Sequence, residues 1–228
     1  MSCGVRVMLL QYRRLVALFL PAILAALAGA APAMADPILP NKSQDRASLY
    51  MRVFGVTSPP YGFVQFCDRD PSACRDGKLE EARMPGHGDF KALLDKVNRA
   101  VNAEIEPATD LEVYGVTEYW AIPTDGRGDC EDYALLKRQR LMQAGWPASA
   151  LLMTVVMDEK NEGHAVLTAR TAHGDFILDN KTDDLKLWHK TSYRFVMRQS
   201  YLNPRIWMSL DPQEAVPSVP LAGVRNNR

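Results

Sequence analysis

The chain has 228 residues with 27 basic and 27 acidic side chains, so its formal net charge is zero. No segment concentrates basic residues into a stripe, and we therefore expect no nucleic-acid partner. The length suits one domain with a sizeable core once a short N-terminal segment is set apart.

Residues 1–35 have the pattern of a secretory signal peptide. Arg13 and Arg14 precede an apolar run over 15–31, and Ala33-Met34-Ala35 forms a small-residue cleavage site. A transmembrane helix is the alternative, but the apolar run is shorter than the ~20 residues that a span requires. We therefore predict a secreted mature chain with no membrane span.

Three cysteines remain after the predicted cleavage. Cys67 and Cys74 lie in one polar segment and could close a small disulfide in an oxidising compartment. A zinc site on this pair is the alternative, but no second close pair of Cys or His completes it. Cys130 is then the odd thiol, which marks it as a candidate reactive residue.

The segment before Cys130 predicts one short strand and one long helix. We expect the strand at 49–56, an apolar core segment at 61–66 and a surface loop at 67–88. A helix then begins after Asp89, whose side chain suits an N-cap. Its apolar residues recur at three- and four-residue spacing: Phe90, Leu93, Leu94, Val97, Val101 and Ile105.

A second helix is expected at 130–144, directly after the glycine-rich turn at 126–129. Cys130 would lie in its first turn, where the helix dipole favours a thiolate. The neighbouring carboxylates of Asp129, Glu131 and Asp132 oppose that effect. A base or a bound cation must therefore offset their charge.

The second half of the chain changes to β-rich runs. We expect strands at 151–157, 164–170 and 175–179, joined by short connectors into an antiparallel meander, and a further strand at 193–198. Helices followed by strands indicate an α+β domain with the helices packed on one side of the sheet.

This pattern divides the chain into three parts. The signal peptide covers 1–35, and one folded domain covers 36–210. The segment 211–228 alternates prolines with small and polar residues, and we predict an extended, poorly ordered tail there.

Cys130, His164 and Asp179 have the order required for nucleophilic catalysis. A thiol needs a base within hydrogen-bond reach, and the base needs an acceptor that orients it. His164 opens one predicted strand and Asp179 ends the next. The start of one antiparallel strand lies beside the end of its neighbour, so the two side chains can meet.

These residues lie in motifs that resemble one protein family, the bacterial transglutaminase-like cysteine proteinases. The family is a branch of the papain and transglutaminase superfamily, and its LapG-type members are periplasmic proteases that cut large surface adhesins. The resemblance covers most of the mature chain, from about Tyr50 to Ser200. It depends mainly on the segments Gly128-Asp129-Cys130-Glu131-Asp132-Tyr133-Ala134, Gly163-His164-Ala165-Val166-Leu167 and Gly174-Asp175-Phe176-Ile177-Leu178-Asp179-Asn180.

The resemblance implies a papain/transglutaminase-like fold and a catalytic triad. Cys130 would attack a peptide carbonyl, His164 would carry the proton to the leaving amine, and Asp179 would orient the imidazole. The backbone N–H of Cys130 is one candidate oxyanion donor, and Tyr119 or Trp120 could supply the second.

LapG-type proteases need calcium, so the resemblance implies the same cofactor here. Asp129, Glu131 and Asp132 are its expected ligands, because clustered carboxylates suit calcium better than zinc. The alternative is that Glu131 and Asp132 only stabilise the helix N-terminus.

The resemblance also implies a periplasmic endopeptidase that cuts the N-terminal region of an adhesin near an alanine pair and releases the cell from its biofilm. An inner-membrane cyclic di-GMP receptor would restrain it through a periplasmic domain. A transglutaminase-type acyl transferase, a non-catalytic calcium-binding module and a zinc–thiolate site at Cys130 and His164 are the alternatives.

Overall fold

A computed structural model describes residues 49–75, 83–84 and 89–213. The predicted signal peptide lies outside the described residues. So do most of the predicted tail and part of the predicted loop at 67–88. Within the described ranges, no helix has both the length and the apolar character needed to cross a membrane.

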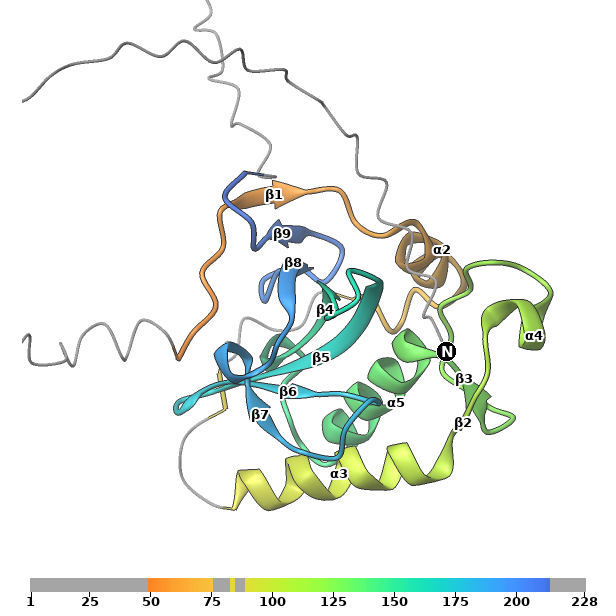
Figure 1. The fold of residues 1–228 in the computed structure, drawn as a ribbon, viewed down its shortest axis with the longest axis horizontal. Helices are drawn as coiled ribbons and strands as arrows, with labels where there is room; N and C mark the ends of the chain where they lie inside the picture. Colours follow the sequence, from red (N-terminus) through yellow and green to blue (C-terminus); the bar gives the residue numbers. More distant parts are fainter. Residues whose placement is uncertain (1–48, 76–82, 85–88, 214–228) are drawn as a thin grey trace, which may run out of the picture.

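The fold is built around a seven-stranded antiparallel sheet with helices on one face (Figure 1). Its seven strands have the order β1-β9-β8-β4-β5-β6-β7. The strands are β1 (Gly55–Thr57), β4 (Leu151–Met157), β5 (Gly163–Thr171), β6 (Gly174–Leu178), β7 (Lys186–Leu187), β8 (Arg194–Gln199) and β9 (Trp207–Ser209). The helices are α2 (Tyr61–Arg69), α3 (Phe90–Glu104), α4 (Asp110–Tyr114) and α5 (Cys130–Gln143), and β2 (Glu106–Pro107) pairs with β3 (Arg127–Gly128) in a separate parallel ladder.

The predicted α+β class and the antiparallel meander are confirmed. Strands β4, β5 and β6 follow one another in space as in sequence, and β8 pairs with the opposite edge of β4. Gly174 opens β6 with a φ of 125°, a backbone conformation that permits the tight turn from β5 and that other residues rarely adopt.

The predicted helices after Asp89 and at Cys130 are also confirmed. Asp89 caps α3 by accepting a hydrogen bond from the backbone N–H of Ala92 at 3.2 Å. Helix α5 packs across β4 and β5, and α3 packs beside α5, with Phe90 of α3 against Phe176 of β6 (Figure 1). The larger of two apolar core clusters therefore fills the space between the helices and one face of the sheet.

Two segments before Cys130 differ from the prediction. The segment at 61–66 is core as expected, but it belongs to helix α2, which buries Phe63 and Phe66. The strand expected at 49–56 is limited to Gly55–Thr57, because its pairing partner β9 is only three residues long. A short apolar run does not show whether its segment is a helix or a strand, and it does not show how long the strand paired with it is.

Cys67 and Cys74 form a disulfide, with their Cα atoms 5.5 Å apart. The bond ties the end of α2 to the loop that follows, and both residues are buried in the core. The zinc alternative for this pair is therefore wrong in this structure.

The Cys67→Ser, Cys74→Ser double variant tests the contribution of this disulfide to stability. Closing so short a loop restricts the unfolded chain, so we expect the variant to lose about 2–3 kcal/mol of unfolding free energy. Urea denaturation of the oxidised proteins measures this loss. A variant as stable as the parent would show that the bond is dispensable.

Candidate active site

Cys130 begins helix α5, as the sequence predicts. Its Sγ accepts a hydrogen bond from the backbone N–H of Ala165 at 3.1 Å, which links the helix start to strand β5. The same sulfur lies 3.1 Å from a carboxylate oxygen of Glu131. The Cys130 sulfur thus connects the N-terminus of α5 to strand β5.

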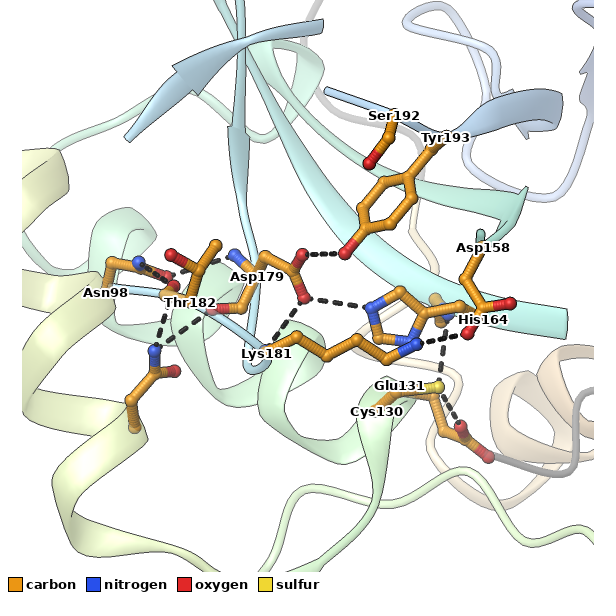
Figure 2. Close-up of polar contacts among 12 residues, drawn as sticks. Asn98, Cys130, Glu131, Asp158, His164, Asp179, Lys181, Thr182, Ser192 and Tyr193 are labelled. Carbon is orange, nitrogen blue, oxygen red and sulfur yellow. Dashed lines mark hydrogen bonds and ion pairs between the residues drawn. The ribbon is translucent and has the colours of Figure 1, made fainter. Parts of the chain in front are cut away.

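His164 and Asp179 are brought together by the β5–β6 pairing. Leu167 pairs with Leu178, so the start of β5 lies beside the chain that leaves β6. The Nε2 of His164 lies 2.9 Å from Oδ1 of Asp179, and both side chains are buried (Figure 2). The predicted meeting of these side chains is therefore present.

The imidazole of His164 lies between the Asp179 carboxylate and the Cys130 sulfur in the view of Figure 2. With Nε2–H donating to Asp179, Nδ1 holds a lone pair. Among the described residues, Nδ1 has no hydrogen-bond partner. This nitrogen is consequently available to accept a proton in the site.

Asp179 is held as a carboxylate by several donors. Its carboxylate accepts from the Tyr193 hydroxyl at 2.5 Å and from the backbone N–H of Lys181 at 3.0 Å. Burial opposes ionisation, but the His164 contact and these hydrogen bonds outweigh it and lower the pKa of Asp179 to about 2. Burial and the bond to Asp179 raise the pKa of Tyr193, which therefore stays a donor.

Helix α3 fixes the backbone around Asp179. The Oδ1 of Asn98 accepts from the N–H of Asp179 at 3.1 Å, and its Nδ2 donates to the carbonyl of Thr182 at 3.1 Å. Asn102, one turn later, donates to the carbonyl of Asp179 at 3.0 Å. These two positioning residues carry no local signal in the sequence, because they lie on α3, 77 and 81 positions from Asp179. Tyr193 does not belong to any of the motifs identified from the sequence.

An acidic cluster lies beside the nucleophile. Asp110, Asp129 and Glu131 each place a carboxylate oxygen within 4.8 Å of the others. Two of them were predicted as metal ligands, whereas Asp110 was not. The parallel β2–β3 pairing explains its presence, because the residues that follow these two strands are brought side by side.

The protonation of this cluster is strongly perturbed. Burial, reinforced by the charge of Asp110, raises the pKa of Asp129 to about 6. Burial and the neighbouring Asp129 raise the pKa of Glu131 well above its usual range. Oxygens Oδ1 of Asp110 and Oδ1 of Asp129 are buried without a hydrogen-bond partner in the described part of the chain. Buried carboxylates with unused oxygens fit a hard cation.

Asp132, the third predicted ligand, lies outside this group of three. Its Oδ1 accepts from the backbone N–H of Ala121 at 2.8 Å, and burial raises its pKa to about 8. Its Oδ2 is buried and has no hydrogen-bond partner among the described residues. Trp120 donates from Nε1 to Glu118 at 2.7 Å, which removes it as a candidate oxyanion donor.

Comparison with known proteins gives one family. A family model described as bacterial transglutaminase-like cysteine proteinase matches residues 53–215. The solved structures that resemble the chain include Legionella pneumophila LapG in a calcium-bound form, at 26% identity and a TM-score of 0.46 over 57% of this chain and 75% of that one. An EGTA-treated form of the same protein is 28% identical, with a TM-score of 0.44 over 52% of this chain and 66% of that one. No curated protein matches significantly.

Asn98→Ala tests how the Asp179 loop is held. The change removes the acceptor of the buried Asp179 N–H and one donor to each of the Thr182 and Asp183 carbonyls, so we expect a loss of about 1–3 kcal/mol in unfolding free energy. The matched control is Arg99→Ala, the next residue of α3, whose exposed ion pairs contribute less than about 1 kcal/mol. Equal losses in the two variants would contradict the assignment.

Proposed function

Because the chain belongs to the bacterial transglutaminase-like cysteine proteinases, we propose that it is a periplasmic, calcium-dependent endopeptidase of the LapG type. One observation carries the catalytic part of the proposal. His164 is hydrogen-bonded to Asp179 through Nε2, and its Nδ1 has no hydrogen-bond partner among the described residues. These are the relations that a Cys-His-Asp triad requires.

This geometry supports the following reaction. Nδ1 of His164 takes the proton of the Cys130 thiol, and the sulfur attacks the carbonyl carbon of the scissile bond. The C–N bond then breaks, and His164 returns the proton to the leaving amine. Water attacks the resulting thioester with His164 as base, which releases the acid and restores the thiol. Asp179 stays ionised throughout and stabilises the imidazolium.

The oxyanion that forms on the carbonyl oxygen needs donors at the start of α5. We assign the backbone N–H of Cys130 as the first donor, because it belongs to the first turn of the helix. The positive end of the helix dipole also stabilises negative charge at this point.

Calcium would be held by Asp110, Asp129 and Glu131, with the buried Oδ2 of Asp132 as a further candidate ligand. A calcium ion held there would supply positive charge beside the nucleophile. It would thereby offset the carboxylates, which otherwise disfavour a thiolate at Cys130. A cation also relieves the mutual repulsion of acids that are buried together.

The substrate and partner follow from the motif resemblance. We propose that the enzyme cuts the N-terminal region of a large surface adhesin near an alanine pair, which releases the adhesin and promotes biofilm dispersal. We propose further that an inner-membrane cyclic di-GMP receptor restrains it through a periplasmic domain.

Cleavage of a purified adhesin N-terminal fragment tests the triad. We expect Cys130→Ala and Asp179→Asn to cut at least about 1,000-fold more slowly than the parent in calcium buffer. The matched control is Asp183→Asn, an exposed acid in the loop after Asp179, which should retain activity. Parental rates in Cys130→Ala would disprove the mechanism, and incorporation of a labelled amine in place of hydrolysis would favour the acyl transferase.

Thermal unfolding tests the cation site separately from activity. At calcium about a hundredfold above its Kd, we expect the Tm of the EGTA-treated parent to rise by about 5–10 °C. Asp110→Asn should lose most of this rise in Tm. Asp125→Asn, which changes an exposed acid in the loop before β3, should keep it. Identical shifts in both variants would place calcium elsewhere.

A further inference from the structure

Two arginines lie on the face of the sheet opposite the helices. Side chains alternate along a strand, and Ala169 of β5 faces the helical core, so Arg170 points to the other face. Arg198 of β8 pairs with Thr154 of β4 and points to the same face as Arg170. The two strands flank β4, so their long side chains can reach one region.

Both arginine side chains are buried, and in the described part of the chain two of the three guanidinium nitrogens of each have no hydrogen-bond partner. Arg170 is 6% exposed and Arg198 is 4% exposed. The Nε and Nη1 atoms of both residues have no hydrogen-bond partner anywhere in the described part of the chain. Tyr201 lies over Arg170, with its ring centroid 4.7 Å from the guanidinium carbon, but an aromatic ring leaves the N–H groups unpaired.

Among the described residues, one carboxylate lies near these arginines, that of Asp175, and both of its oxygens already accept hydrogen bonds. Asp175 accepts from Arg83 at 2.6 Å through Oδ1 and from the backbone N–H of Met51 at 2.8 Å through Oδ2. Three arginines therefore face one acid in this region. Burial, together with repulsion from Arg198 and Arg83, lowers the pKa of Arg170 to about 10, so it stays charged at neutral pH.

The hydroxyl groups on this face of the sheet do not serve the arginines either. Thr154 donates to the carbonyl of Leu152 at 3.1 Å, and its Oγ1 lies 2.7 Å from Oγ1 of Thr168. Buried guanidinium N–H groups without hydrogen-bond acceptors are costly for a fold. An anion with several oxygens would supply what the N–H groups lack.

We propose that Arg170 and Arg198 form a binding site for a small oxyanion such as inorganic phosphate or sulfate. Guanidinium groups pair with such anions through parallel hydrogen bonds. The burial of both side chains favours a small free ion over an acidic side chain of a partner protein. The site is distinct from the triad, because Arg170 lies six residues along β5 from His164, about 20 Å away.

Thermal unfolding in matched buffers tests the site. With EGTA present throughout, sulfate or phosphate should raise the parent Tm by at least about 2–4 °C over chloride of equal ionic strength. Arg198→Met should abolish this anion-specific rise. In chloride it should also melt no lower than the parent, because it removes an unpaired buried charge.

The matched control is Arg194→Met, an exposed arginine on the same strand, which should keep the full anion effect. Arg170→Met provides a second test if Arg198→Met does not fold. An equal Tm in chloride and sulfate, or an undiminished rise in the folded Met variants, would overturn the proposal. These results are independent of the protease assignment, since neither arginine contacts the triad.

Discussion

The site depends on one hydrogen bond, between Nε2 of His164 and the carboxylate of Asp179. The antiparallel register of β5 and β6 makes this bond possible, because it places the beginning of one strand beside the end of the other. The bond fixes the imidazole tautomer and leaves Nδ1 without a hydrogen-bond partner among the described residues. Asn98 and Tyr193 then hold Asp179 in place from two other elements.

The second constraint is electrostatic. A thiolate at the start of α5 is favoured by the helix dipole, yet the same turn buries Glu131 beside Asp129 and Asp110. These acids have raised pKa values because they are desolvated and close together. A bound cation would resolve the conflict, and this is the physical reason for connecting calcium with catalysis in the proposed function.

The sequence predicted the parts of the site that depend on local pattern. The period of the apolar residues located α3, the glycine-rich turn before Cys130 located α5, and β-rich runs located the three meander strands. Chain order then connected Cys130, His164 and Asp179. Asp110 and Asn98 were missed because strand pairing and helix packing bring them to the site across long sequence separations. Arg170 and Arg198 gave no signal, since a basic residue in an alternating strand normally points to solvent.

The rate of Cys130 alkylation is the most direct test of the central claim that His164 activates this thiol. Iodoacetamide labelling at pH 7, with the modified residue identified by mass spectrometry, compares the parent with His164→Gln. The account predicts that Cys130 reacts at least about tenfold faster in the parent, because the imidazole accepts the thiol proton. Equal rates in the two proteins would contradict it.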